Sequence, residues 1–428
     1  MNTAQLHQKF LLTSGAGTDT RNIQEGSMFF ALKGANFNGN KYAAEALQKG
    51  AKLAVVDDPD YALNKEQYIL VKNVLQSLQA LATFHRKFLG IPIIGITGSN
   101  GKTTTKELTQ AVLSRKYNTV ATSGNLNNHI GVPLTLLSMN ENTEIGIVEM
   151  GANHPGEIEF LCNITCPDYG YITNFGKAHL EGFGSLEGVI KAKSELYNHL
   201  KDHKKLIFLN YDDEVQKKHS RYNHVFSFGR SRNAHVKIEF PGETASATLE
   251  FNNTRFTSKL TGRYNALNMA AALSIGLYFK VLFSDIKEAI ENYTPSNNRS
   301  QLIEMGSNTI LMDAYNANPT SMMAALENFR DTDTKKTKIV ILGDMLEVGD
   351  SSEVEHQAIV NFITNNDFSE TYLVGPNFKK THFNKSTVIK FNDTSSLKKH
   401  LKLSKTENSF ILIKGSRGMA LENLLDAL

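Results

Sequence analysis

The chain has 428 residues, of which 41% are hydrophobic and 21% charged; at about 150 residues per domain, this length suggests three domains with real cores. The 46 basic and 43 acidic residues leave a net charge of +3, which excludes the composition of a disordered chain and gives no sign of a nucleic-acid or membrane-surface protein. The N-terminus lacks a signal-peptide pattern and no apolar run reaches the ~18 residues of a membrane span, so we expect a cytoplasmic protein that is not inserted in a membrane. We also expect a monomer without nucleic-acid partners.

Residues 1–88 mix short strands with helices and predict a small mixed α/β domain. Apolar runs at 28–32 and 53–56 are typical of buried strands, and the stretch 42–50 between them favours a helix. A second helical pattern at 77–89 leads into Gly90-Ile91-Pro92, which is typical of a boundary.

From residue 89 to 297 the pattern changes to alternating strands and helices, which predicts a central parallel sheet covered on both faces. Short alternating strands between 234 and 260, with a turn at Pro241-Gly242, predict a small antiparallel insertion, and an Ala-rich helix follows at 265–279. The predicted strands of the parallel sheet are 93–96, 145–148, 169–172 and 206–209.

The two cysteines, Cys162 and Cys166, lie inside this central part with the spacing C-N-I-T-C. This is not C-x-x-C, and no second Cys/His pair lies nearby, so disulfide-scaffold and zinc-finger classes are excluded. We expect both to be reduced structural residues.

The turn-rich segment 293–298 predicts the second boundary. Beyond it, apolar strands again alternate with helical stretches, so residues 298–428 are predicted to form a Rossmann-like α/β domain. The predicted strands are 310–312, 339–342, 372–374 and 410–413.

The strongest functional motif is Gly98-Ser99-Asn100-Gly101-Lys102-Thr103-Thr104, directly after the strand predicted at 93–96. Glycines let backbone amides turn around phosphate oxygens, and the following helix N-terminus adds a positive dipole. Lys102 can reach the terminal phosphates and the Thr103 hydroxyl can ligate Mg²⁺. Position 96, where the strict template has glycine, is Ile96, yet an ATP-binding loop remains a better interpretation than a Gly-rich turn before an ordinary helix.

Glu149 ends the strand predicted at 145–148 and is the candidate second ligand of the metal. Mg²⁺ prefers oxygen ligands and keeps several waters, so one carboxylate together with ATP phosphates forms a normal site. The alternative is a strand-terminal glutamate in solvent. By itself, His179 is more simply interpreted as a polar histidine with satisfied hydrogen bonds.

The phosphate loop, followed by G-N-L-N-N-H-I-G-V-P at 124–133, resembles the Mur ligase family, whose own loop also departs from the template at the first glycine. These are ATP-dependent amide-forming enzymes of peptidoglycan synthesis, related to folylpolyglutamate synthetase. Further similar blocks span the chain, at 149–153, 172–174, 178–184, 260–265 and Asn268.

The two ends are similar to the branch of the family that joins D-alanyl-D-alanine to UDP-MurNAc-tripeptide. The D-N-P-R motif of the branch that adds diaminopimelate or lysine is absent. Departures from the family pattern occur at Asn38-Gly39-Asn40, Met312 and Ala314. The similar blocks are T-D-T-R at 18–21, F-F-A-L-K-G at 29–34, D-A-Y-N-A-N-P at 313–319, L-G-D-M-L-E at 342–347 and K-G-S-R at 414–417.

The resemblance implies a two-step reaction. ATP phosphorylates the terminal carboxylate of UDP-MurNAc-tripeptide to an acyl phosphate, and the amine of D-alanyl-D-alanine then displaces phosphate to give UDP-MurNAc-pentapeptide. Residues 1–88 would bind the UDP-sugar, residues 89–297 ATP, and residues 298–428 would close over ATP. Catalysis would then consist mainly of charge neutralisation and positioning.

The implied cofactors are ATP and two Mg²⁺ ions, the first held by Thr103 and Glu149 and the second by His179 and Lys193. Lys193 aligns with a lysine that is carboxylated in several family members, and a carbamate would make it an oxygen ligand. Its alternative is a solvated helix lysine. The other implied ATP contacts are Asn268 to adenine, Asp313 to the ribose and Arg299 to the γ-phosphate. The implied substrate contacts are Asn125 and Asn128 to the carboxylate and phosphate, and Thr20, Arg21 and Lys33 to the uridine diphosphate. Lys414 would move inward on closure, and Tyr315, Asn316 and Asn318 would shape a turn.

Three other interpretations stay open at this point. A related amide ligase could add a different amino acid or peptide. A P-loop transporter or signalling ATPase would hydrolyse ATP without an amine acceptor, but it leaves the N-terminal domain unexplained. A non-catalytic scaffold would need a lost lysine or acid, whereas Lys102, Thr103, Glu149 and His179 are all present.

Overall fold

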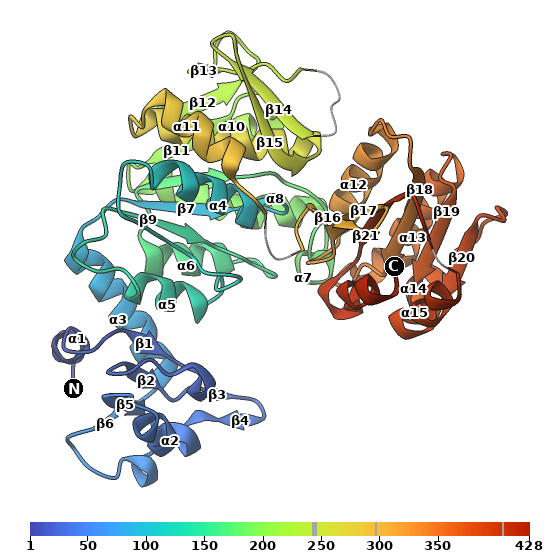
Figure 1. Ribbon diagram of the computed structural model, residues 1–428. Coiled ribbons are helices and arrows are strands. Elements are labelled where there is room, and N and C mark those ends of the chain that lie inside the picture. The colour runs from blue at the N-terminus through green and yellow to red at the C-terminus, as the bar shows by residue number, and fades with distance from the viewer. Residues whose placement is uncertain (242–245, 296–297, 405) are drawn as a thin grey trace.

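The computed structural model of the protein describes residues 1–241, 246–295, 298–404 and 406–428. The chain forms a three-domain α/β fold, in which the central domain lies between the N-terminal and C-terminal domains (Figure 1). The second residue of the turn predicted at Pro241-Gly242, and residues 296–297 of the predicted second boundary, lie outside the described residues.

The N-terminal domain contains a parallel sheet in the order β1-β2-β5-β6 and a small β3-β4 hairpin. The predicted strands are confirmed as β2 and β5, which are fully buried because every side chain is apolar. The elements are α1 (Thr3–Phe10), β1 (Ala16–Gly17), β2 (Met28–Phe30), β3 (Lys33–Gly34), β4 (Phe37–Asn38), α2 (Ala43–Gln48), β5 (Leu53–Val56), β6 (Tyr68–Leu70) and α3 (Val74–Leu89).

Helix α3 attaches this domain to the central one. It begins after the capping residue Asn73 and ends at Gly90, which has φ +63°. Near its end, Arg86 Nη2 lies 2.6 Å from Asp168 Oδ2, and the imidazole of His85 hydrogen-bonds the carbonyl of Met139 at 2.9 Å. The end of α3 is therefore built into the central domain.

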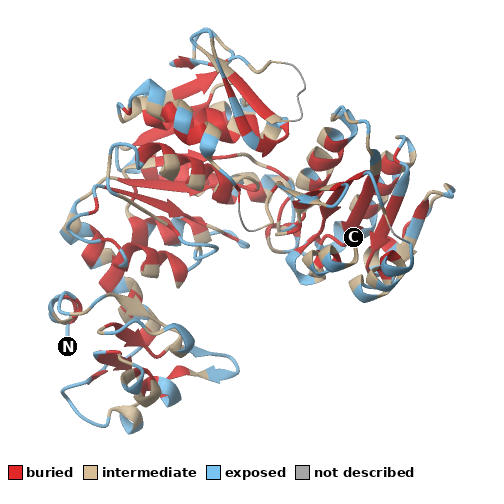
Figure 2. Ribbon diagram, in the orientation of Figure 1, coloured by how far each residue is buried: buried red, intermediate tan, exposed pale blue. Residues whose placement is uncertain are grey.

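The central domain contains a seven-stranded parallel sheet in the order β13-β12-β11-β10-β7-β9-β8. Its four predicted strands are confirmed, and Figure 2 shows them buried between helices. The strands are β7 (Ile93–Thr97), β8 (Thr119–Ala121), β9 (Ile145–Glu149), β10 (Tyr169–Ile172), β11 (Leu206–Asn210), β12 (Val225–Gly229) and β13 (Val236–Lys237).

Helices cover both faces of this sheet. Apolar side chains of α4, α10 and α11 pack on one face, and those of α5, α6 and α8 pack on the other. The helices are α4 (Lys102–Leu113), α5 (Gly131–Leu137), α6 (Glu157–Thr165), α7 (Leu180–Phe183), α8 (Leu186–Asp202), α9 (Glu214–Ser220), α10 (Arg263–Tyr278) and α11 (Phe283–Asn292). Both cysteines are free, and Cys162 is buried in this core.

The predicted antiparallel insertion is partly confirmed. Strands β14 (Ser246–Phe251) and β15 (Thr254–Thr261) form an antiparallel hairpin. Asn252 and Asn253 make its turn with φ of +49° and +57°, because asparagine tolerates the left-handed region better than most residues. The prediction was wrong for β13, which pairs in parallel with β12 as the edge of the central sheet.

The C-terminal domain has a six-stranded sheet in the order β16-β17-β21-β18-β19-β20, parallel except for the edge strand β16. Its four predicted strands are confirmed. Helices α12 and α13 pack on one face and α15 on the other. The elements are β16 (Gln301–Met305), β17 (Asn308–Asp313), α12 (Pro319–Asp331), β18 (Thr337–Gly343), α13 (Ser352–Thr364), β19 (Glu370–Val374), α14 (Pro376–Lys379), β20 (Val388–Phe391), α15 (Thr394–Leu403) and β21 (Ser409–Lys414).

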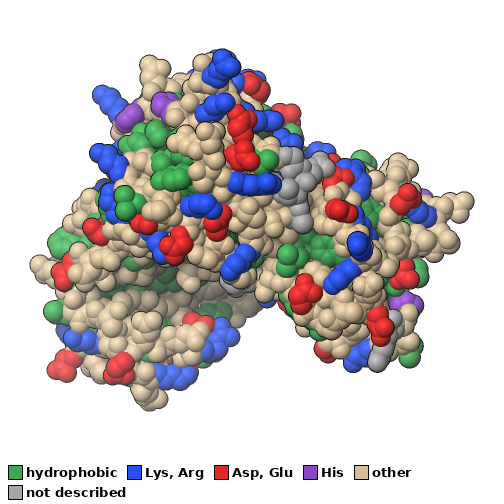
Figure 3. All heavy atoms as spheres, turned by 45° about the horizontal axis from the view of Figure 1, so that its top comes forward, with side chains coloured by type: hydrophobic (Ala, Val, Ile, Leu, Met, Phe, Trp, Pro, Cys, Tyr) green, Lys and Arg blue, Asp and Glu red, His purple; other side chains and the backbone are tan. Residues whose placement is uncertain are grey.

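Short 3₁₀ helices complete the described secondary structure, at Thr20–Asn22, Gly39–Tyr42, Pro59–Tyr61, Gly349–Ser351, Arg417–Met419 and Leu421–Ala427. Within the described residues, the search for a helix with the length and hydropathy of a membrane span gives none. Basic and acidic side chains are interspersed over the face drawn in Figure 3, in keeping with the small net charge.

Strand order fixes where a ligand would bind. Strand β7 lies between β9 and β10, so the carboxyl ends of all three meet at one edge of the central sheet. Ligands of open α/β sheets bind beyond the carboxyl ends of the strands, where the direction of strand order reverses. The phosphate loop follows β7 and Glu149 ends β9, so both lie at this edge.

Candidate active site

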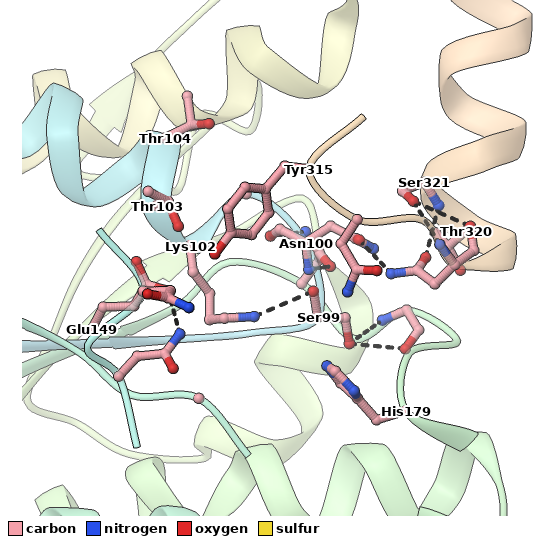
Figure 4. Close-up of a pocket in the computed structure, with 18 of the residues that line it drawn as sticks. Ser99, Asn100, Lys102, Thr103, Thr104, Glu149, His179, Tyr315, Thr320 and Ser321 are labelled. Carbon is pink, nitrogen blue, oxygen red and sulfur yellow. Dashed lines mark hydrogen bonds between the residues drawn. The ribbon is translucent and has the colours of Figure 1, made fainter. Parts of the chain in front are cut away.

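A cavity of about 650 Å³ lies at this edge, between the central and C-terminal domains. Figure 4 shows residues of both domains around it. The structure therefore brings together most of the predicted ATP and metal contacts from segments far apart in the chain. Among the predicted residues, the cavity is lined by Ser99, Asn100, Gly101, Lys102, Thr103, Thr104, Asn125, Asn128, Glu149, His179, Asn268, Arg299, Asp313, Tyr315, Asn316, Asn318 and Lys414.

Two glycines allow the shape of the phosphate loop. Gly98 has φ +140°, and a Cβ there would lie 2.0 Å from the Thr173 hydroxyl oxygen. Gly101 has φ +79°, and its Cβ would lie 2.7 Å from Asn268 Oδ1. Ile96, which stands where the strict template has its first glycine, is a buried residue of β7. The required glycines are those that contact neighbouring elements closely.

Lys102 is the first residue of α4, directly after the loop. Its ammonium donates to the carbonyl oxygen of Gly98 at 2.7 Å. It also donates to the carbonyl oxygen of Ser99 at 3.4 Å (Figure 4). Burial lowers the pKa of Lys102, while the nearby carboxylates of Glu149 and Glu347 oppose this shift. The ammonium is thus directed at the loop that would hold phosphates.

Glu149 is 1% exposed at the end of β9. Its Oε1 accepts a hydrogen bond from Asn127 Nδ2 at 2.8 Å, whereas its Oε2 is buried and has no hydrogen-bond partner among the described residues. A buried carboxylate oxygen without a partner is costly unless a cation compensates it. Glu149 is therefore not the solvated glutamate of the alternative interpretation, and its environment fits a cation site.

The donor set around this oxygen suits Mg²⁺. The Thr103 side chain is also buried in the cavity wall, and both groups offer oxygen ligands. No group of three or more His, Cys, Asp or Glu side chains among the described residues is arranged to hold a metal ion.

His179 lies between β10 and α7 with φ +51°. Its Nδ1 lies 2.7 Å from Oε2 of Glu347, which comes from the C-terminal domain. This contact with His179 is the main reason that the pKa of Glu347 is lowered. The motif at 342–347 carried the family resemblance, but no pattern in the sequence indicated that its glutamate faces His179.

Lys193 is entirely buried on α8. Its Nζ donates to the carbonyl of Ala152 at 3.2 Å and lies 5.2 Å from the centre of the Phe183 ring. Burial, and then the charge of Lys102, lower its pKa well below the ordinary value. The alternative of a solvated helix lysine is therefore wrong, although Lys193 does not contribute to the cavity wall.

The loop between β8 and α5 carries three asparagines with different roles. Asn125 and Asn128, the two predicted substrate contacts, are exposed and line the cavity. Asn128 also accepts hydrogen bonds from the backbone N–H groups of Ile130 and Gly131 at the start of α5. Asn127, which the sequence did not single out, contacts Glu149 instead.

Asn268 forms the wall beneath the loop on the side of α10. It is buried, accepts a hydrogen bond from the Thr105 hydroxyl at 3.1 Å and donates to Asn265 Oδ1 at 2.9 Å. These contacts fix its amide directly under Gly101.

The C-terminal domain supplies the opposite wall. The Arg299 guanidinium carbon lies 3.6 Å from the centre of the Tyr315 ring, and Arg299 Nε is buried without a hydrogen-bond partner among the described residues. Asp313 ends β17, where it accepts hydrogen bonds from Lys414 and from the backbone N–H of Ser300. Arginine, aspartate and aromatic ring therefore face the phosphate loop.

Polar contacts join the two domains beside the loop. Asn318 Nδ2 donates to Asn100 Oδ1 at 2.7 Å, and the backbone N–H of Lys177 donates to the Thr320 hydroxyl at 2.9 Å. The ammonium of Lys177 lies 2.5 Å from a carboxylate oxygen of Glu355. Figure 4 shows Thr320 and Ser321 on the side of Asn100.

The predicted uridine diphosphate contacts lie elsewhere. Thr20, Arg21 and Lys33 belong to the N-terminal domain and do not line the cavity. The Arg21 side chain is 85% exposed and pairs with Asp19 at 2.6 Å, which holds the pKa of that carboxyl at about 2. Lys33 pairs with Asp57 at 2.9 Å. Both basic groups are thus neutralised within their own domain.

Three family models match the chain in succession. The model described as Mur ligase family, catalytic domain, matches residues 13–86. The Mur ligase middle domain matches residues 96–276, and the Mur ligase glutamate ligase domain matches residues 298–417.

Individual proteins match over almost the whole chain. The UDP-N-acetylmuramoyl-tripeptide–D-alanyl-D-alanine ligase of Bacillus subtilis is 35% identical over 421 residues, covering 96% of this chain and 92% of that protein. A MurF crystal structure from Acinetobacter baumannii has a TM-score of 0.85 at 28% identity, covering 99% and 98% of the two chains. MurF from Thermotoga maritima in complex with ADP has a TM-score of 0.82 at 28% identity, covering 97% of each chain.

Proposed function

The chain belongs to the Mur ligase family, and from this we propose that it is the ATP-dependent ligase that joins D-alanyl-D-alanine to UDP-MurNAc-tripeptide. The product would be UDP-MurNAc-pentapeptide for peptidoglycan synthesis. The observation that carries the proposal is the meeting, in one cavity, of the phosphate loop, Glu149 and the C-terminal Arg299 and Asp313. The full-length relatives named for this reaction favour it over a different amide ligase or a simple ATPase.

ATP would bind with its phosphates on the loop from Gly98 to Thr104. Lys102 and the N–H groups at the start of α4 would neutralise the phosphates, while Asn268 and Asp313 would contact the adenine and the ribose. Arg299 would leave the ring of Tyr315 to reach the γ-phosphate. The similar structure of MurF from Thermotoga maritima in complex with ADP supports nucleotide binding by this fold.

Thr103 and Glu149 would hold one Mg²⁺, which supplies positive charge against the phosphates when bound. The unpartnered Oε2 of Glu149 supports this assignment. We place a second Mg²⁺ near His179 and Lys193, with Lys193 as a carbamate. A buried amine with one carbonyl partner supports that modification, because a neutral amine reacts with CO₂.

The peptide substrate would place its terminal carboxylate beside Asn125, Asn128 and Lys102. There the carboxylate attacks the γ-phosphorus of ATP and ADP leaves, which gives the acyl phosphate. The amine of D-alanyl-D-alanine then attacks the carbonyl carbon, loses its proton and expels phosphate. Two anions meet in the first step, so Lys102 and Arg299 contribute mainly by neutralising charge.

The proposal assigns residues 1–88 to the UDP-sugar, with Thr20, Arg21 and Lys33 at the uridine diphosphate, residues 89–297 to ATP and residues 298–428 to closure over ATP. It also has the enzyme act as a monomer in the cytoplasm. Sedimentation equilibrium tests the first of these expectations and cell fractionation the second.

Phosphate release from Mg·ATP tests the proposal directly. The assay contains UDP-MurNAc-tripeptide with and without D-alanyl-D-alanine, and the product is identified by its mass. We expect that phosphate release requires both substrates and that the product has the mass of UDP-MurNAc-pentapeptide. Release with neither substrate would indicate an ATPase, and release with another amine acceptor only would indicate a different amide ligase.

Labelling with ¹³C-bicarbonate tests the modification of Lys193. A carbamate carbonyl signal is expected in the wild type and should be missing in Lys193→Ala. An identical signal in both proteins would contradict the assignment to Lys193.

A further inference from the structure

Asn127 has no role in the proposed reaction so far, yet it contacts Glu149, the proposed metal ligand. The loop leaves β8 at Ala121 and returns to the carboxyl end of β9, where Asn127 Nδ2 donates to Glu149 Oε1 at 2.8 Å. Figure 4 shows this hydrogen bond beside Glu149. Since Glu149 is almost wholly buried, water does not compete for the contact.

The orientation of the Asn127 amide is determined by its surroundings. An ionised carboxylate only accepts hydrogen bonds, so the nitrogen of the amide must face Glu149. The backbone carbonyl of Asn127 accepts from the N–H of Gly151 at 2.8 Å, and a Cβ on Gly151 would lie 2.8 Å from Asn127 Oδ1. The side chain is therefore fixed on both sides of the strand end.

A second contact fixes the backbone of Glu149. Its N–H donates to the Thr122 hydroxyl oxygen at 2.9 Å, and the carbonyl of Thr122 accepts from the buried ammonium of Lys106 at 2.6 Å. With its backbone and Oε1 both held, Glu149 has one carboxylate oxygen, Oε2, that finds no hydrogen-bond partner among the described residues.

We propose that Asn127 is a positioning residue of the metal site: by holding Oε1 it fixes the side-chain conformation in which Glu149 presents Oε2 to the Mg²⁺ of Mg·ATP. The inference rests on the proposed nucleotide site but not on the identity of the amine acceptor. Partners that orient a metal ligand are typically worth about 10–100-fold in metal affinity. Loss of Asn127 should thus affect the metal and leave the nucleotide contacts intact.

Binding of Mn²⁺ to the protein–ADP complex, followed by electron paramagnetic resonance, tests this without any turnover. Asn127→Ala is expected to weaken Mn²⁺ binding about 10-fold, while its affinity for ADP in the presence of EDTA stays within about twofold of the wild type. Asn142→Ala, an exposed asparagine of the same domain, is the matched control and should bind Mn²⁺ like the wild type. Asn127→Ser, whose side chain is too short to reach Glu149, repeats the test if Asn127→Ala fails to fold.

A double-mutant cycle separates positioning from other effects. In the Glu149→Gln background, Asn127→Ala should produce no further loss, because the ligand it positions has been removed. An undiminished loss there, or wild-type Mn²⁺ affinity in Asn127→Ala and Asn127→Ser, would overturn the inference alone. Failure of the wild type to bind Mn²⁺ with ADP would overturn the nucleotide site together with it.

Discussion

In the proposed reaction, Lys102 would be the side chain on which phosphate transfer depends most directly, because its ammonium lies against the loop at the start of α4. Lys102→Ala should lower kcat about 10²–10³-fold, as expected for removing one preorganised donor to developing charge. The exposed Lys335, replaced by Ala, is the matched control in phosphate release. Near-wild-type turnover in Lys102→Ala would contradict the role of the loop.

The buried imidazole of His199 should make the stability of the protein depend on pH. Burial first, and then the charge of His203, lower the pKa of His199 from 6.5 to about 4. Between pH 6.5 and pH 4, His199 is therefore protonated in the unfolded chain but neutral in the folded chain. The free energy of unfolding consequently falls as the pH is lowered from 6.5 to 4. The loss from this group amounts to at most about 3 kcal/mol.

Urea unfolding at pH 7.5 and pH 5 measures this effect. His199→Gln should show a smaller difference between the two pH values than the wild type, whereas the exposed His382→Gln should keep the full difference. An unchanged pH dependence in His199→Gln would mean that other groups carry the acid sensitivity.

The positions of candidate site residues were predictable from sequence where residue type and place in an element suffice. Lys102, Thr103 and Glu149 follow from a loop and a strand end, and the structure brings all three to one cavity. Asn127 could not be distinguished from Asn125 and Asn128, because only the path of the loop decides which asparagine faces Glu149.

At the scale of elements, buried strands were predictable because they are continuous apolar runs, as in β7, β9 and β10. Strand β16 was missed because it has no fully buried residue and pairs at an edge. The parallel pairing of β13 could not be predicted, since its two residues carry no signal of their partner.

The start of α12 combines two functions in Asn318. Its side chain caps the helix by accepting from the N–H of Ser321, and its amide donates to Asn100 of the phosphate loop. Asn318→Ser keeps a good cap but loses the contact, whereas Asn318→Ala loses both. We expect a several-fold higher KM for ATP in both variants, but a lower Tm only in Asn318→Ala, where the cap costs about 1 kcal/mol.

Thermal unfolding and ATP saturation curves check this pair. The contact with Asn100 would be unimportant for ATP binding if Asn318→Ser had the KM of the wild type. The capping role would be contradicted if both variants melted together with the wild type.

At the scale of the molecule, the two outer domains are attached differently. The N-terminal domain is joined by α3, whose buried side chains His85 and Arg86 contact the central domain. The C-terminal domain contacts the phosphate-loop region through polar pairs such as Asn318–Asn100 and Lys177–Glu355. Polar interfaces of this kind permit relative domain motion.

Small-angle scattering should therefore show compaction when an ATP analogue, Mg²⁺ and UDP-MurNAc-tripeptide are added together. Spin-label distances should shorten between the central and C-terminal domains and stay constant between the central and N-terminal domains. No compaction, or a change confined to the N-terminal domain, would contradict closure by residues 298–428.

The attachment of α3 to the central domain also has a consequence for the length of the substrate. If residues 1–88 bind the uridine diphosphate, the distance from there to Glu149 is set by a helix that Arg86 and His85 join to the central domain. In that case, only a peptide of one length can extend from the uridine diphosphate site to the phosphate loop. The spacing of the two domains would then select the number of residues attached to the sugar, independently of the recognition of their side chains.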